Sequence, residues 1–360
     1  MTGSSAHAPD TKTPFEEFIS LLREARTKTD PDFEGIASVL KRTLDELTIS
    51  ERAEALNALA VLVAERDLEP GLQILKVLDA FRDRHLFVKA VVEEGAQRDP
   101  RRAAEWASRL PEPALTETAY NAIGMKWGQT DLETSLAWAK GLSDPSLRLS
   151  AFEGVTWAWA QKNADATYEW AAQIPEADIR DKVFVKLAKM VSTQEPRRGA
   201  EWALHFPEGP GRTEALDYAV FHWAGKDLKA AAEWASGIPD SQLLESSLVA
   251  VARSWSNNDP RQATEWAAQL PDSPARTSAL ITTARKWAEA NPAAAAEWIG
   301  GQAQSPARVD VFKGVTSALA NSLPATAEAW MSHVLDPGLR AAGEQVFALK
   351  QEALPLAPRP

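Results

Sequence analysis

Tryptophan recurs at a constant spacing through most of this chain. Eight tryptophans follow one another at intervals of 32 residues, at Trp106, Trp138, Trp170, Trp202, Trp234, Trp266, Trp298 and Trp330. Self-similarity with a period of about 20 to 50 residues is typical of arrays in which one small unit stacks on the next and buries a shared core. The spacing therefore constrains the architecture strongly, whereas it indicates little about chemistry.

Each 32-residue block has the pattern of two helices. The first half opens with residues that mostly cap helix N-termini, at Asp99, Asp131, Asn163, Glu195, Asp227, Asp259 and Asn291. Its apolar residues keep helical spacing, and so do those of the second half, as in Leu280, Thr283, Ala284 and Trp287. We predict a first helix of about ten residues and a second of about fourteen. Because no strand-like alternation intervenes, the expected fold is all-α, an α-α superhelix (solenoid) of antiparallel helical hairpins.

Other residues also recur once per block. A second tryptophan series, which includes Trp127 and Trp159, ends the second helix 11 residues before the next first-helix tryptophan, so the two rings are expected to meet between blocks. Arginine recurs near the start of the second helix and glutamate in the first. Four blocks hold both partners, for example Glu201 and Arg212, which suggests a salt bridge within the block. A residue required in every block belongs to the scaffold more often than to a site.

The periodicity also predicts the organisation of the chain. Residues 1–13 are expected to be a disordered tail, residues 14–98 a divergent N-terminal helical capping segment, residues 99–354 eight hairpin repeats, and residues 355–360 a second disordered tail. The capping segment is expected because the tryptophan position is occupied by Ile74 one period earlier and by Arg42 two periods earlier.

Three residues at the start of a block resemble part of a known helical repeat. Asp259, Pro260 and Trp266 form an Asp-Pro pair followed by tryptophan, an arrangement similar to the junction between tetratricopeptide repeats, although those units are two residues longer. We therefore identify the region as tetratricopeptide-like. The resemblance implies binding of a protein or peptide along a concave face lined by the first helices of the blocks.

Composition narrows the classes of function. Fifty acidic against 39 basic residues leave a net charge of −11, which disfavours nucleic acid and favours a basic partner. There is no cysteine, and the five histidines have no zinc-ligand spacing, so neither a metal nor a cofactor is expected. No nucleotide-binding or nucleophile motif occurs, which argues against an enzyme.

The length of the apolar stretches and the N-terminal sequence predict where the protein is located. No apolar stretch reaches 18 residues, so membrane insertion is not expected. The N-terminus lacks a signal-peptide pattern, so the expected compartment is the cytoplasm, with a periplasmic or exported protein whose signal has been removed as the alternative.

The candidate binding residues are those that depart from the repeat rule. The position two residues after each tryptophan points away from the core and is mostly small. Larger side chains gather in three successive blocks and are predicted to form a partner-binding strip: Leu136, Lys140, Tyr168, Leu204 and His205. The alternative is that Leu136 and Tyr168 pack against a neighbouring helix.

The leading hypothesis is a non-enzymatic scaffold that binds a protein or peptide on the inner face of the solenoid. An α/α toroid hydrolase or lyase with a central pocket is the alternative, because such enzymes are also built from helical hairpins rich in aromatic residues. A third hypothesis is self-association through the end hairpins.

Overall fold

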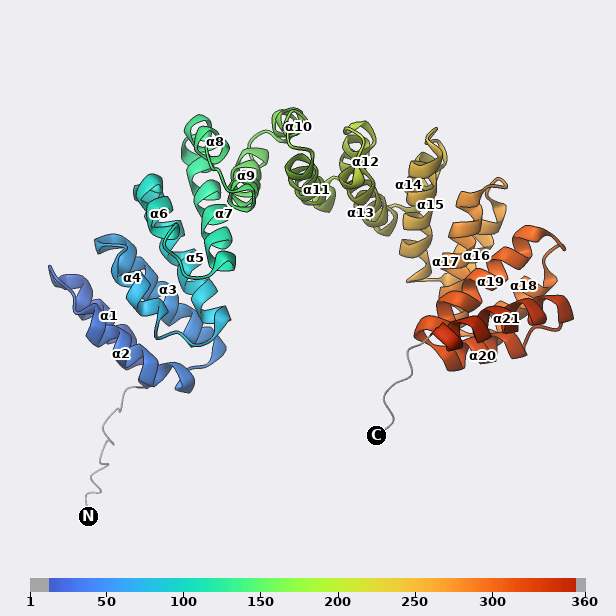
Figure 1. Ribbon diagram of the computed structural model, residues 1–360, viewed down its shortest axis with the longest axis horizontal. Helices are drawn as coiled ribbons and strands as arrows, with labels where there is room; N and C mark the ends of the chain where they lie inside the picture. The colour runs from blue at the N-terminus through green and yellow to red at the C-terminus, as the bar shows by residue number, and fades with distance from the viewer. Residues whose placement is uncertain (1–12, 354–360) are drawn as a thin grey trace, which may run out of the picture. The chain divides into compact units, whose positions relative to one another are not determined.

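The structure is a computed structural model that describes residues 13–353. Within this range all regular elements are helices, labelled α1 to α21 with one short 3-10 turn, η1 (Leu44–Glu46) (Figure 1). The two predicted disordered tails lie outside the described residues, apart from Thr13. Thr13 caps α1 with its side chain, which accepts a hydrogen bond from the backbone N–H of Glu16.

The chain divides into two compact units, residues 1–179 and 180–360, which are described separately. In the first unit the helices are α1 (Pro14–Thr27), α2 (Phe33–Thr43), α3 (Ile49–Arg66), α4 (Pro70–Leu75), α5 (Phe81–Arg98), α6 (Pro100–Ala107), α7 (Pro113–Thr130), α8 (Leu132–Lys140), α9 (Pro145–Ala160) and α10 (Ala164–Ala171). Helix α11 (Ala177–Gln194) begins at the boundary. The second unit continues with α12 (Pro196–His205), α13 (Pro210–Lys226), α14 (Leu228–Ser236), α15 (Ser241–Ser256), α16 (Pro260–Gln269), α17 (Pro274–Ala290), α18 (Pro292–Gly301), α19 (Pro306–Ser322), α20 (Pro324–Ser332) and α21 (Pro337–Ala353).

Each 32-residue block from Asp99 onward contains one short and one long helix, as the periodicity predicts. The prediction of an all-α solenoid of helical hairpins is therefore confirmed. The long helices are longer than expected, for example 16 residues in α9 and 17 in α17. Several start earlier because they have their own N-cap and a proline at the first position, as Asp144 with Pro145 and Ser273 with Pro274 show.

The predicted caps of the short helices are confirmed with one exception. The side chains of Asp99, Asp131, Asn163, Asp227, Asp259 and Asn291 accept hydrogen bonds from backbone N–H groups of the first helical turn. Glu195 makes no such bond, because its side chain pairs with Arg198 at 3.1 Å instead. The start of nearly every repeat is thus specified locally by the sequence.

In both units the long helices form the closely packed row. Helices α3, α5, α7 and α9 pack against one another in chain order in the first unit, as do α13, α15, α17, α19 and α21 in the second (Figure 1). In the first unit each of α4, α6 and α8 contacts the long helices on either side, and within the described residues consecutive members of this short row make few direct contacts. Because the row whose members are closest lies inside a curve, the long helices form the inner side of the first unit. The tetratricopeptide resemblance implied the reverse.

The sizes of the side chains explain why the long helices pack more closely than the short helices. At the α7–α9 interface, Gly124 and Gly154 bring backbones into contact, since a Cβ on Gly124 would lie 2.5 Å from the carbonyl oxygen of Ala151. Between the short helices and their neighbours stand tryptophan pairs, with ring centroids 5.4 Å apart for Trp127 and Trp138 and 5.9 Å for Trp159 and Trp170. The predicted meeting of the two tryptophan series is therefore confirmed, and these large side chains fill the space between α7 and α8 and between α9 and α10.

The recurrent arginine caps the preceding short helix. In five of these arginines the guanidinium group donates a hydrogen bond to a carbonyl oxygen at the helix end; Arg148, for example, donates to Leu142 at 2.7 Å. The five are Arg84, Arg148, Arg212, Arg308 and Arg340. Such contacts satisfy carbonyl groups that have no partner within the helix. The recurrent arginine is a scaffold residue, as predicted.

The salt bridge that the sequence suggests within the block does not form between Glu201 and Arg212. Arg212 donates to the carbonyl oxygen of Leu204, and Glu201 pairs with Arg197 one turn away at 2.8 Å. For Arg148, a carboxylate just before the next long helix takes the predicted role instead: Glu176, which directly precedes α11, lies 3.6 Å from Arg148. The unpaired carbonyls draw the arginine toward the helix end and away from the exposed glutamate.

Two equivalent tryptophans differ in how their indole N–H is satisfied. Trp330 is fully buried, and its Nε1–H donates to the hydroxyl of Thr316 at 3.1 Å, while this hydroxyl donates to the carbonyl of Phe312 at 2.8 Å. Trp106 is equally buried, but its Nε1 has no partner among the described residues. Val92 precedes Trp106 by the same 14 residues that separate Thr316 from Trp330. The first unit thus holds an unsatisfied donor.

Replacing Val92 by threonine should satisfy this donor and raise the free energy of unfolding by up to about 1 kcal/mol, whereas Thr316→Val should lower it by about 1–2 kcal/mol. The new hydroxyl can donate to the carbonyl of Val88 within α5, so it brings no unsatisfied group of its own. Urea denaturation of both variants beside the wild type measures the changes. Equal midpoints for all three proteins would show that the indole bond contributes nothing.

Candidate functional site

The predicted binding residues lie on the short helices and are accessible to different degrees. In the first unit, Leu136 and Lys140 lie one turn apart on α8, and Tyr168 lies on α10. Leu136 and Tyr168 are half-buried and Lys140 is exposed. Neither apolar side chain is fully buried, so the strip stays a prediction in this unit.

The other two predicted residues belong to the second unit. Leu204 is half-buried near the end of α12, where its carbonyl accepts the hydrogen bond from Arg212. His205 is exposed, and its Nδ1 lies 2.8 Å from the carbonyl oxygen of Glu201 in the same helix. The backbone of Leu204 therefore serves the scaffold while its side chain is partly accessible.

A pocket opens beside one of the predicted residues, Lys140. It has a volume of about 350 Å³ and lies between the end of α8, the start of α9 and the end of α10. Its walls come from Lys140, Arg148, Phe152, Trp170, Gln173, Ile174, Pro175 and Glu176. This volume falls in the range of about 300–1,000 Å³ that is usual for ligand pockets. The site is therefore large enough for one or two side chains of a partner.

The pocket combines an aromatic wall with an excess of positive charge. Trp170 stands edge-on to Phe152, with ring centroids 5.2 Å apart, and keeps part of its surface accessible. Arg148 is occupied by the Leu142 carbonyl and by Glu176. Lys140 has no ion pair or side-chain hydrogen bond within residues 13–353. Its ammonium group is the charge that the scaffold leaves available.

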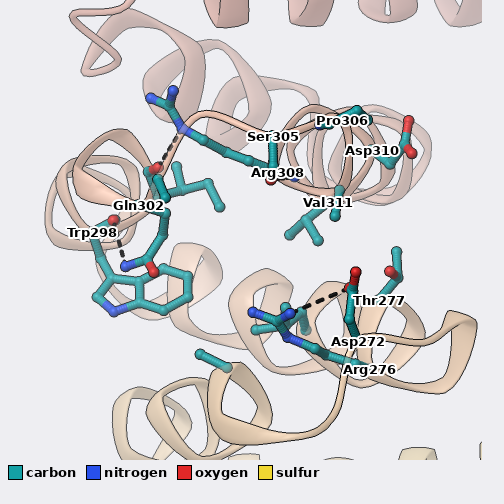
Figure 2. A pocket seen from close by; sticks show the side chains of 15 residues that line it. Asp272, Arg276, Thr277, Trp298, Gln302, Ser305, Pro306, Arg308, Asp310 and Val311 are labelled. Atoms are coloured by element: carbon teal, nitrogen blue, oxygen red, sulfur yellow. Dashed lines mark hydrogen bonds and ion pairs between the residues drawn. The ribbon is translucent and has the colours of Figure 1, made fainter.

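The second unit contains a larger pocket of about 560 Å³ between the hairpins α16–α17 and α18–α19 (Figure 2). Figure 2 shows Trp298 and Gln302 on one side of the opening and Asp272 and Arg276 on another. Arg276 donates to Asp272 at 3.3 Å, and the amide of Gln302 donates to the carbonyl oxygen of Trp298 at 3.2 Å. The polar groups around this pocket are thus partly engaged with one another.

The two pockets occupy the same place in the repeat, four blocks apart. Six positions of the smaller pocket recur in the larger one: Lys140, Arg148, Phe152, Trp170, Ile174 and Pro175 correspond to Ala268, Arg276, Leu280, Trp298, Gln302 and Ala303. Arginine and tryptophan are shared, while lysine becomes alanine and phenylalanine becomes leucine. The smaller side chains account for part of the extra volume, and the lost lysine removes a charge.

The charges around the larger pocket balance. Arg308 is almost fully buried, and its three nitrogens donate to the carbonyls of Ile299 and Gly300 and to the carboxylate of Asp336. Asp272 and Asp310 are exposed carboxylates at the rim. Both arginines of the larger pocket therefore have a carboxylate partner, Arg276 in Asp272 and Arg308 in Asp336.

Metal and membrane sites were also sought among residues 13–353. No group of three or more histidine, aspartate or glutamate side chains is arranged to hold a metal ion in this part of the chain. No helix in the same range is both long and apolar enough to cross a membrane.

The residues that form the pocket walls were interpreted from the sequence as scaffold. Arg148, Phe152 and Trp170 follow the repeat rule, so nothing in their own spacing distinguishes them. The signal that points to the site is Lys140, a large residue at a position where most blocks have a small one. The sequence thus identified one residue at the rim and missed the wall.

No protein-family model matches this chain, and a search of curated proteins finds no match.

Proposed function

We propose that this protein is a non-enzymatic, tetratricopeptide-like scaffold that binds a protein or peptide partner on the short-helix side of its first unit. The observation that carries the proposal is the pocket beside Lys140, whose wall contains Trp170. Aromatic side chains in pockets are typical anchors of protein interfaces. Leu136 and Tyr168 on the same two helices are half-buried, so part of each side chain is accessible as well.

The short-helix side suits this role for a physical reason. The long helices are packed against one another, so their row leaves little space between repeats. The short helices α8 and α10 stand apart, and the gap between them is where a partner's side chain can enter. An extended or helical segment could then place successive side chains along neighbouring short helices.

An enzyme is the less favoured function. Asp272 and Asp310 are the carboxylates that line the larger pocket, but both are exposed and Asp272 is engaged by Arg276. Exposed acids on helix ends are usually solvated surface groups, and catalytic acids are usually held in a shielded site.

Selection of random peptides displayed on phage against the immobilised full chain tests the proposal. We expect enriched peptides whose affinity falls at least about tenfold in the double variant Leu136→Ala, Tyr168→Ala, because truncated apolar anchors typically cost more than about 1–2 kcal/mol. A second double variant, Leu204→Ala with His205→Ala, measures whether the second unit contributes.

The matched control is Ile49→Ala, which removes an apolar side chain of the first unit that is 68% exposed and lies away from α8 and α10. It should leave the affinity unchanged. Failure to enrich any peptide, or equal binding by Leu136→Ala, Tyr168→Ala and the wild type, would contradict the proposed function.

A further inference from the structure

We infer that the pocket between α8 and α10 accepts an acidic side chain of the bound segment, which pairs with Lys140 while a neighbouring apolar side chain packs on Trp170. This inference deepens the proposed function and rests on it. It assigns a partner chemistry to one pocket, whereas the net charge of the whole chain by itself favours a basic partner.

The lining of this pocket carries an excess of positive charge. The pocket lining holds two cations, Lys140 and Arg148, against one carboxylate, Glu176. Arg148 has only 18% of its side chain exposed and is occupied by Glu176 and by the Leu142 carbonyl. Lys140 is exposed and has no carboxylate partner among the described residues. One positive charge is therefore left for a ligand.

Only charges close to the pocket act strongly on a group inside it. Charges that are exposed to solvent are screened beyond about 8 Å at physiological ionic strength. The net charge of −11 on 360 residues therefore acts weakly on a group inside the pocket, whereas Lys140 acts at contact distance. The local cation decides which side chain the pocket prefers.

The pocket combines this charge with an apolar wall. Trp170 is partly accessible and stands edge-on to buried Phe152, and Ile174 is buried as well. A small free anion would leave this surface in contact with water, whereas an acidic side chain next to an aliphatic or aromatic one would cover it. The arrangement favours a peptide segment over free carboxylates.

The equivalent pocket of the second unit provides an internal comparison. Ala268 occupies the position of Lys140, and Arg276 already has Asp272 as its partner. The lining of that pocket contains two arginines and two aspartates, so it has no excess charge. We therefore assign the preference for acidic side chains to the first pocket alone.

Charge reversal at Lys140 tests the inference. The probes are a fluorescein-labelled synthetic peptide with a selected sequence and the same peptide with its acidic residue changed to lysine, both measured by fluorescence anisotropy. Wild type should bind the acidic peptide about five- to tenfold more tightly than the lysine peptide, and Lys140→Glu should reverse this order. Lys140→Ala, which reproduces Ala268, should abolish the preference.

Lys89→Glu is the control, because it changes the net charge by the same amount at an exposed lysine on α5. It should keep the preference of the wild type. Thermal melts of all variants confirm folding, and free glutamate in excess should not displace the peptide.

The outcomes separate the two proposals. If peptides are selected but Lys140→Glu behaves like Lys89→Glu, or if selected peptides carry no acidic residue, the charge assignment is overturned and the scaffold function stands. If free glutamate displaces the peptide, the pocket is a small-molecule site. A selection without any binder overturns both proposals.

Discussion

Replacing Gly154 by alanine is expected to lower the free energy of unfolding by about 3 kcal/mol or more, because the added methyl group would overlap backbone atoms of the neighbouring helix. A Cβ at this position would collide with the carbonyl oxygen of Asn121 and lie 2.7 Å from the backbone nitrogen of Met125. Backbone atoms cannot turn aside as a flexible side chain can, so α9 would have to move away from α7. Urea denaturation followed by tryptophan fluorescence measures the loss.

Two other glycines make the test a graded series. Gly128→Ala adds a methyl group 3.3 Å from its nearest neighbours, so a smaller loss is expected. Gly300→Ala adds one where no heavy atom lies within 4 Å, and it should stabilise the helix by about 0.5–1 kcal/mol. Equal urea midpoints for Gly154→Ala and the wild type would show that α7 and α9 are farther apart than described.

Replacing Arg308 by methionine is expected to cost about 3 kcal/mol, because it removes three donors from a nearly water-free position. The side chain is 6% exposed, and its nitrogens donate to the carbonyls of Ile299 and Gly300 and to Asp336 at 3.0 Å. The backbone N–H of Leu339, and to a smaller extent Arg308 itself, hold the pKa of Asp336 below its usual range, so this partner is charged at neutral pH. Methionine fills a similar volume but leaves these acceptors unpaired.

Arg340→Met is the matched control, since Arg340 occupies the same repeat position but is exposed. It donates to the carbonyl of Val334 at 2.7 Å, where water can replace it, so a loss below about 1 kcal/mol is expected. Differential scanning calorimetry of both variants gives the comparison. Similar losses would mean that burial does not distinguish the two arginines.

Much of the fold could be predicted from the sequence because its signals are local. A cap such as Asp99 acts on N–H groups two and three residues away, and apolar residues at helical spacing define a face within one helix. The contact between Trp127 and Trp138 could be predicted as well, because they are close in the chain. The predicted second helix of about fourteen residues is shorter than α9, which has 16 residues and begins at Pro145 after the cap Asp144.

The candidate site was predictable only in part. Lys140 stood out because it breaks the pattern of small residues, and the structure places it at the rim of a pocket. The pocket itself is formed by Trp170 and Phe152, which come from different blocks and follow the repeat rule. No local pattern shows that a recurrent tryptophan such as Trp106 is fully buried while Trp170 keeps an accessible surface.

The sequence by itself determined that the chain is a series of helical hairpins, where almost every short helix begins, and which residues recur in every joint. Only the tertiary structure decided that the long helices pack closely while the short helices of the first unit stand apart, and that Lys140 lacks a counter-charge among the described residues. The physical reason is that hairpin formation depends on neighbours within a few residues. Row spacing and pocket charge depend on the summed sizes and partners of side chains from different blocks, such as Gly124 with Gly154 and Phe152 with Trp170.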